Sequence, residues 1–284
     1  MPDFAIVDAH VHLYDPRRLS YPWMKQAPAL DRPYLSDDFT RLTTGVDIEA
    51  MIFVEVDAAP GEHLAETRFA QEQAAVEPRL RGMVASMPLE KGSGVEPELV
   101  EYAKSPLARG VRRLIERHHH EPGWALGDNF ITGVRLLAKF GFTFDLCLFH
   151  QQLAEVNELV RRCPEVNFVV DHIAKPGIQQ GLREPWRQDL RSISRLPNVC
   201  CKISGVVTEA DHANWTEAEV APYIDHAIDC FGFERVMFGG DWPVSELATS
   251  YRRWVDLVDM VVAGASNAEK RRLYRDNAIA FYRL

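Results

Sequence analysis

The sequence predicts an α/β protein that folds as a single-domain (β/α)8 barrel. Short apolar segments typical of strands alternate with stretches typical of helices along the whole chain. We find eight strand-like segments, which begin near Phe4, Met51, Leu80, Ala108, Gly141, Val166, Val199 and Arg235. No internal repeat, low-complexity tract or linker divides the 284 residues, so we assign residues 1–284 to one domain.

The apolar patterns support both kinds of element. The runs Phe168–Val170 and Val236–Phe238 are apolar at every position, as in parallel strands that are buried on both faces. Between the strands, apolar residues recur with the spacing of a helix face, for example in residues 224–231 and 254–261. Eight parallel strands with helices between them are typical of a closed barrel.

Polar residues follow several of these predicted strands. In a (β/α)8 barrel the chemistry takes place at the carboxyl ends of the strands. The polar residues at those ends are His10, His12, Glu55, Asp57, Arg112, Arg113, Asp145, Asp171, His172, Lys175, Lys202, Ser204 and Asp241. We expect the active site among these side chains.

The pair His10 and His12 is the most informative, because it directly follows the first strand-like segment, which starts at Phe4. Alternate residues of a strand point to the same side, so both imidazoles should face one point. This arrangement suits a metal ion or a substrate carbonyl. A structural role is the alternative for a single histidine, but two histidines at this spacing favour function.

Two segments are expected to cover the mouth of the barrel. The first is a long loop after the first strand, residues 13–43, which carries Trp23 among several prolines. We expect Trp23 to form a wall of the pocket, although capping the barrel is an equally good role for any aromatic residue of this loop. The second is residues 116–128, with consecutive histidines at 118–120. Consecutive side chains do not converge easily on one ion, so surface positions are the simpler interpretation.

Composition and charge argue against several classes of function. The formal net charge is −9, and no basic run with interleaved aromatic residues is present, so nucleic acid is not an expected partner. No apolar segment approaches the roughly 20 residues that span a bilayer, and the N-terminus lacks a basic stretch followed by an apolar one. We therefore expect a cytoplasmic protein without a membrane partner.

The cysteines are interpreted as small core residues. There are five of them, an odd number without the spacing of a C-x-x-C metal motif: Cys147, Cys163, Cys200, Cys201 and Cys230. A nucleophilic cysteine is the alternative, but the sequence shows no histidine neighbour that would activate it.

Four segments, each at a predicted strand end, occur in an order that resembles the amidohydrolase superfamily. They are DAHVH at residues 8–12, VVDHIAKP at 169–176, CKISGVVTEAD at 201–211 and FGGDWPV at 238–244. Within the superfamily, the chain looks most like the lactonase branch of amidohydrolase-related family 2, which holds L-fuconolactonase, L-rhamnonolactonase and the pyrone dicarboxylate lactonase. The similarity covers nearly the whole chain and ends with DNAIAFYRL at residues 276–284.

The resemblance implies a central constellation of four residues: His10, His12, His172 and Asp241. It also implies that His10, His12 and Asp241, together with His172, could hold one divalent ion such as zinc or manganese. The branch includes members that work without a metal, so both forms of the site are consistent with the resemblance.

The chain departs from the pattern of superfamily members that bind two metals. Those members generally have a bridging lysine or glutamate at the fourth strand and a histidine at the fifth. Here the fourth strand carries Arg112 or Arg113 and the fifth carries Asp145, which argues against a second metal. Asp8 and Asp171 lie close to key histidines in the sequence. We expect them to point to the opposite face and to be structural.

The implied reaction is attack of water on an ester carbonyl, with Asp241 as general base. An aspartate with a pKa of about 4 is a poor base at neutral pH, so a partner must acidify the water or stabilise the oxyanion. His10 and His12, directly or through one ion, would polarise the carbonyl, and His172 would orient the water or stabilise the oxyanion. Asp241 would then return the proton to the leaving alkoxide. The structural alternatives are a capping role for Asp241 and a core role for His172.

The expected wall residues bear on the substrate. A dicarboxylate lactone of the pyrone or muconolactone type favours several arginines, for which Arg112, Arg113 and Arg117 are candidates. A neutral sugar lactone needs mixed polar donors and aromatic walls. The candidate substrate-binding residues are Trp23, Glu55, Arg112, Arg113, Lys175 and Trp242. The segment SGVVTEADH, residues 204–212, looks closer to the sugar lactonases, so we predict hydrolysis of an aldonolactone such as an L-fuconolactone-like compound, in carbohydrate metabolism.

Two other functions are kept as alternatives. A metal-dependent decarboxylase of the same superfamily would release carbon dioxide from an aromatic acid. A sugar-binding barrel without catalysis would keep the pocket but would not need Asp241.

Overall fold

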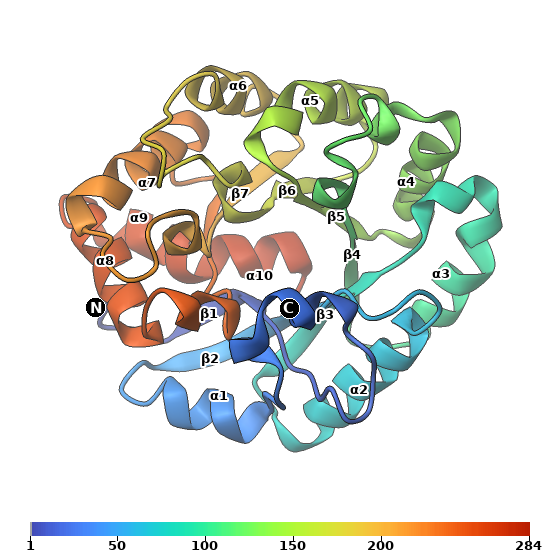
Figure 1. Cartoon of the computed structure of the whole chain (residues 1–284), viewed down its shortest axis with the longest axis horizontal. Coiled ribbons are helices and arrows are strands. Elements are labelled where there is room, and N and C mark those ends of the chain that lie inside the picture. The colour runs from blue at the N-terminus through green and yellow to red at the C-terminus, as the bar shows by residue number, and fades with distance from the viewer. Residues whose placement is uncertain (1) are drawn as a thin grey trace.

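The computed structural model describes residues 2–284 and shows a ring of strands surrounded by helices (Figure 1). The strands are β1 (Ile6–Val11), β2 (Ile48–Val54), β3 (Leu80–Ser86), β4 (Ala108–Leu114), β5 (Thr143–Cys147), β6 (Phe168–Val170), β7 (Val199–Ile203) and β8 (Val236–Phe238). The helices are α1 (Ser36–Leu42), α2 (His63–Val76), α3 (Glu96–Tyr102), α4 (Asp128–Phe140), α5 (Leu153–Arg162), α6 (Trp186–Ile193), α7 (Glu217–Phe231), α8 (Tyr251–Val261), α9 (Asn267–Arg271) and α10 (Asn277–Tyr282). All strand pairs are parallel and follow chain order from β1 to β8, which confirms the predicted (β/α)8 barrel.

The sheet closes through backbone contacts between the end of β1 and the segment that follows β8. The amide of Asp241 donates to the carbonyl of His10, and the amide of His12 donates to the carbonyl of Trp242, both at 2.8 Å. Val11 and Trp242 also form a parallel bridge. The seam of the barrel therefore runs through the predicted site residues and holds their backbones against one another.

The predicted strands are all present, and the largest displacement of a start is at β2, which begins at Ile48 rather than Met51. The predicted loop of residues 13–43 contains a helix near its end, because α1 occupies Ser36–Leu42. Two acidic residues in the first turn of α1, Asp37 and Asp38, favour a helix N-terminus there. Across residues 2–284, no helix combines the length and the apolar character that crossing a bilayer requires.

The interior of the barrel has two layers. The lower lumen is apolar and is closed by α10, which lies across the barrel (Figure 1). It consists of Val7, Ala9, Ala50, Ile52, Val54, Val84, Val169, Met237, Ala278 and Tyr282. The upper lumen, near the carboxyl ends, holds four buried charged residues, Arg112, Asp145, Asp171 and Lys202. A larger apolar cluster fills the space between the strands and the outer helices.

Candidate active site

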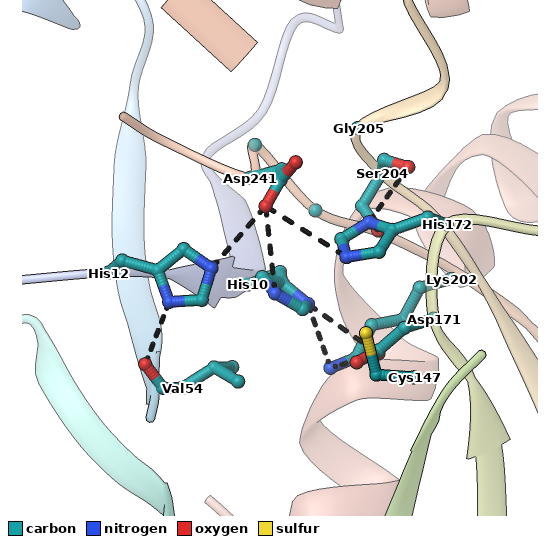
Figure 2. Close-up of polar contacts among 12 residues, drawn as sticks. His10, His12, Val54, Cys147, Asp171, His172, Lys202, Ser204, Gly205 and Asp241 are labelled. Carbon is teal, nitrogen blue, oxygen red and sulfur yellow. Dashed lines mark hydrogen bonds and ion pairs between the residues drawn. The ribbon is translucent and has the colours of Figure 1, made fainter. Parts of the chain in front are cut away.

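His10 lies in β1 and His12 directly follows it, so both lie at the carboxyl end of this strand, in the centre of the upper end of the barrel. A register shift between Asp8 and Val11 interrupts the alternation of the strand. Asp8 therefore points outward and accepts a hydrogen bond from the hydroxyl of Tyr251 in α8 at 2.9 Å, while both histidines point inward (Figure 2). The expected structural role of Asp8 agrees with this contact, which ties α8 to β1.

Asp241 follows β8 on a turn that requires small neighbours. Asp241 itself has a φ of 51°. A Cβ atom at Gly239 would lie 2.9 Å from the Cβ atoms of both His10 and Ser204, and a Cβ atom at Gly205 would collide with the Asp241 carboxylate. The two glycines therefore let the strand ends approach closely enough for the carboxylate to reach the histidines.

The chain after β6 makes one left-handed turn. His172, Ile173, Ala174 and Lys175 have φ values of 53°, 48°, 63° and 47°. This conformation costs about 1 to 2 kcal/mol for each L-residue. In a regular strand, the adjacent residues Asp171 and His172 would point to opposite faces. Because of the turn, both side chains point into the barrel. The expectation that Asp171 faces away from the histidines is therefore wrong, since strand alternation ends at this turn.

The three imidazoles meet at the carboxylate of Asp241, as Figure 2 shows. Oδ1 of Asp241 lies 3.4 Å from Nε2 of His12, 3.7 Å from Nε2 of His10 and 4.0 Å from Nε2 of His172. All four side chains are buried. The structure thus brings the whole predicted constellation to one point.

Backbone carbonyls orient two of these imidazoles. Nδ1 of His12 lies 2.8 Å from the carbonyl oxygen of Val54, and Nδ1 of His172 lies 3.2 Å from that of Ser204. A carbonyl oxygen only accepts, so Nδ1 of His12 carries the proton and its Nε2 presents a lone pair toward Asp241. Nδ1 of His172 also lies 2.9 Å from Oγ of Ser204, a hydroxyl that can donate or accept. Lone pairs and a carboxylate oxygen that face one another are unfavourable unless a cation or a proton lies between them.

This donor set fits one divalent metal ion. His10, His12 and Asp241 each offer a ligand atom, and these atoms lie within 4.8 Å of one another. Imidazole nitrogen and carboxylate oxygen are ligands that zinc and other divalent ions accept. The inward lone pair of His12, which faces the Asp241 carboxylate, is the observation that supports the fit.

Burial and neighbouring charges set the protonation states of the site. Burial, followed by the charge of Lys202, lowers the pKa of His10 well below its usual range, and burial also lowers the pKa of His172. Burial alone would raise the pKa of Asp241, but the neighbouring His172 and the contact with His12 outweigh burial and hold that pKa well below its usual range. At neutral pH the site therefore combines an ionised carboxylate with neutral imidazoles at His10 and His172.

Lys202 lies beneath His10 among buried carboxylates. Its Nζ donates to Oδ2 of Asp145 at 2.5 Å and lies 3.0 Å from Oδ1 of Asp171 and 3.2 Å from Nδ1 of His10. The hydroxyl of Tyr282, in α10, donates to the same oxygen of Asp145 at 2.7 Å. This chain of contacts connects the site to the C-terminal helix.

Arg112 supplies a second fixed positive charge beside the site. Its Nε donates to Oε1 of Glu55 at 2.7 Å, and its Nη2 donates to the carbonyl oxygen of Glu55 at 2.6 Å. Its Nη1 lies 3.2 Å from Nε2 of His10 and 3.5 Å from Oδ2 of Asp171. Because Arg112 and Lys202 both face Asp171, their charges oppose a second metal ion there.

A cavity of about 160 Å³ opens above this constellation. That volume is smaller than the roughly 300 to 1,000 Å³ of pockets for drug-sized ligands, so it suits a compact ligand. Three of the predicted substrate-binding residues, Trp23, Arg112 and Lys175, form part of its wall. The full wall consists of His12, Trp23, Val56, Asp57, Arg112, Leu114, Glu116, Arg117, Cys147, His172, Lys175, Thr208, Asp241 and Val244.

The other three predicted substrate-binding residues lie outside the cavity wall. Trp242 is fully buried and packs against the rings of Tyr34 and Phe39, because the closing seam turns it away from the mouth. Arg113 points to the opposite face of β4 from Arg112 and pairs with Glu90. Glu55 holds Arg112 instead of facing the cavity. We therefore assign these three residues supporting roles.

Sequence reasoning missed Cys147 as a cavity residue, and it named Glu116 only as the start of the segment expected to cover the mouth. Glu116 pairs with Lys175 and accepts a weak hydrogen bond from the Cys147 thiol at 3.5 Å. The available signal was their position, since Cys147 ends β5 and Glu116 lies two residues after the end of β4. Burial raises the pKa of the Cys147 thiol, and its polar neighbour is a carboxylate rather than a histidine, which supports a wall role over a nucleophilic one.

The three consecutive histidines lie outside the cavity wall. The ring of His118 stacks on Trp124 with the centroids 3.6 Å apart. His119 and His120 are exposed. This arrangement agrees with the surface interpretation of residues 118–120.

Comparisons with known proteins agree with one another. The family model described as amidohydrolase matches residues 7–284. The L-fucono-1,5-lactonase of Burkholderia multivorans is 32% identical over 289 residues, which cover 98% of this chain and 96% of that protein. The L-rhamnono-gamma-lactonase of Scheffersomyces stipitis is 22% identical, with 100% of both chains covered. The crystal structure of a Burkholderia multivorans amidohydrolase with bound zinc is 30% identical, with a TM-score of 0.86 and coverage of 99% of this chain and 100% of that chain.

Proposed function

The chain belongs to the amidohydrolase family, and from this premise we propose that it is a lactonase that opens a sugar-acid lactone. The observation that carries the proposal is the ionised Asp241 carboxylate, surrounded by three imidazoles at the base of a compact cavity. The names of the Burkholderia and Scheffersomyces relatives, both sugar lactonases, support the same class of substrate.

In the proposed mechanism, Asp241 accepts a proton from the attacking water. The Nε2 lone pair of His172 accepts the second hydrogen of that water and orients it toward the lactone carbonyl. Arg112 donates a hydrogen bond to the oxyanion from a position fixed by Glu55. Asp241 then gives its proton to the ring oxygen as the carbon–oxygen bond breaks, which leaves the open-chain hydroxy acid.

A low pKa makes Asp241 a weak base, so the water must be made more acidic. A divalent ion held by His10, His12 and Asp241 would lower the pKa of water and polarise the carbonyl when it is bound. The positive charge of Arg112 also favours the attack of water without a metal ion, because it stabilises the negative charge that develops on the carbonyl oxygen.

The charges of the cavity wall favour a neutral, hydroxylated substrate over a dicarboxylate. Each cation of the wall already has a carboxylate partner: Arg112 with Glu55, Lys175 with Glu116, and Arg117 with Asp57. A substrate carboxylate would have to compete with these partners for its hydrogen bonds. We therefore propose an aldonolactone rather than a pyrone or muconolactone-type dicarboxylate.

A lactone panel tests this proposal. We expect kcat/KM to be higher for aldonolactones than for 2-pyrone-4,6-dicarboxylate, and the reverse ranking would contradict the proposed substrate class. Asp241→Asn should lower kcat/KM on the best aldonolactone by about 10²- to 10⁴-fold while the far-UV circular dichroism stays unchanged. Release of carbon dioxide from an aromatic acid would instead favour the decarboxylase.

Metal analysis tests the proposed single ion. We expect no more than one equivalent of divalent metal per chain in elemental analysis, because Arg112 and Lys202 oppose a second ion. Two equivalents that disappear together on treatment with a chelator would contradict this charge argument.

A further inference from the structure

We propose that Lys175 and Glu116 form a subsite that binds two adjacent hydroxyl groups of the substrate ring and thereby selects polyhydroxylated lactones. The inference rests on the proposed function and names the residues that would set the substrate preference of the lactonase. Both side chains belong to the cavity wall, and they pair with each other there.

The pair has hydrogen-bonding capacity beyond its own contact. Lys175 has three donors and Glu116 has two carboxylate oxygens. Within residues 2–284, the contacts of Glu116 with Lys175 and with the Cys147 thiol both use Oε2, so Oε1 keeps its accepting capacity. The two side chains are 18% and 16% exposed, which leaves them accessible from the cavity.

The position of Lys175 is held on several sides. Its Nζ lies 5.4 Å from the centroid of the Phe149 ring, in addition to its pairing with Glu116. Its backbone belongs to the left-handed turn that also carries His172. Strained backbone of this kind persists where the surrounding structure holds functional groups in place. The turn therefore sets a constant spacing between the subsite and the reaction centre at Asp241.

The chemistry of the pair matches two neighbouring hydroxyl groups. A hydroxyl both donates and accepts, so one can donate to the carboxylate of Glu116 while its neighbour accepts from the ammonium of Lys175. Neither contact requires the ion pair to separate. A substrate carboxylate in the same place would be repelled by Glu116, and an unsubstituted ring would leave both charged groups without a polar partner from the ligand.

The test compares two lactones in Lys175→Met and Glu116→Gln. The substrates are L-fuconolactone, which carries adjacent hydroxyl groups, and δ-valerolactone, which has a ring ester without them. We expect the ratio of kcat/KM for the hydroxylated lactone to that for δ-valerolactone to fall about 10- to 100-fold in each variant. A ratio that stays within about twofold of the wild-type value in both variants would overturn the subsite.

Lys91→Met serves as the matched control, because Lys91 forms an ion pair with Glu98 outside the cavity wall. It should leave both activities and their ratio unchanged. A thermal melt of each variant shows whether it folds, and Glu116→Gln keeps the test valid if Lys175→Met does not fold.

Calorimetric binding of methyl α-L-fucopyranoside separates this inference from the proposed function. This ligand carries adjacent hydroxyl groups but no ester. If the wild type hydrolyses no lactone, the lactonase proposal fails. Binding that weakens about tenfold or more in Lys175→Met would still support the subsite, whereas equal binding to both proteins would overturn it.

Discussion

The lower and the upper lumen of the barrel are built from different interactions. The lower lumen is a cluster of apolar side chains closed by α10, whereas the upper lumen holds the buried charged residues Arg112, Asp145, Asp171 and Lys202. Burial of apolar surface stabilises the fold directly. Buried ion pairs add little net stability, because desolvation of each charge offsets the attraction. The lower lumen therefore accounts for stability, and the upper lumen is better explained by the positions it imposes on His10 and Asp171.

Backbone strain also differs between the two ends of the barrel and is concentrated at the upper end. Among residues 2–284, seven non-glycine residues have a positive φ, and six of them belong to the upper end of the barrel: Asp57, His172, Ile173, Ala174, Lys175 and Asp241. Four of these six belong to the cavity wall, and the other two lie within the turn between His172 and Lys175. The strain is thus confined to the backbone that presents the candidate functional groups.

The largest effect on stability is expected for Lys202→Met in the upper lumen. Loss of the ammonium leaves Asp145 and Asp171 as neighbouring buried carboxylates without their cation. We expect a loss of about 3 to 5 kcal/mol in the free energy of unfolding, together with lower activity, because His10 loses a neighbour at its Nδ1. Urea denaturation measures the first and kcat the second. A stability loss below about 1 kcal/mol would contradict the argument that Asp145 and Asp171 depend on Lys202 for charge compensation.

Ile52→Ala is the corresponding change in the lower lumen. Ile52 is fully buried, and its truncation should lower the free energy of unfolding by about 3 kcal/mol through lost burial and a cavity. We expect kcat per folded molecule to stay unchanged, because the residue lies below the ionic layer. A fall in kcat that is as large as that of Lys202→Met would contradict the separation of the two layers.

Glu209 ends the short 3-10 helix Val206–Glu209, which follows the carboxyl end of β7. Glu209→Gln therefore tests the electrostatics of the upper end through pH. Burial raises the pKa of Glu209 from 4.5 to about 7. The folded protein therefore binds more protons than the unfolded chain between these values, and the contribution of Glu209 to stability is lost as the pH rises through 7. Glutamine does not titrate. We expect the variant to gain about 3 kcal/mol relative to the wild type between pH 4.5 and pH 8 in urea denaturation. A difference that does not depend on pH would contradict the raised pKa.

The smallest effect is expected for Ala174→Gly, in the left-handed turn. Glycine adopts the φ of 63° without the Cβ penalty, so the variant should be more stable by about 0.5 to 1 kcal/mol. Ala70→Gly, in the interior of α2, is the control and should lose at least about 1 kcal/mol. Differential scanning calorimetry of the two variants checks the opposite signs. A loss of stability in Ala174→Gly would mean that the turn is not strained.

Much of the fold could be predicted from local patterns. Apolar runs and helix-face spacing indicated the order of the strands and helices, since buried parallel strands are apolar at nearly every position. The pair His10 and His12 was expected to face one point, and the structure places both imidazoles at Asp241. The helix α1 was missed, because a short helix of seven residues has little periodicity to detect.

The direction of several side chains could not be predicted from the same patterns. Strand alternation fails at the left-handed turn after β6, which is why Asp171 was assigned to the wrong face. Alternation separates Arg112 from Arg113, but the sequence does not mark which of the two faces the lumen. The pairing of Lys175 with Glu116 depends on two strand ends that lie 59 residues apart in the chain.

The sequence by itself determined the barrel, the order of its strands and the four motifs at its carboxyl ends, because these depend on spacing between near neighbours in the chain. Tertiary structure alone decided which charged residues face one another, which cations of the cavity are already neutralised, and where strand alternation gives way to strain. The physical reason is that these properties arise from the distances between side chains of different strands, which are established only when the barrel closes.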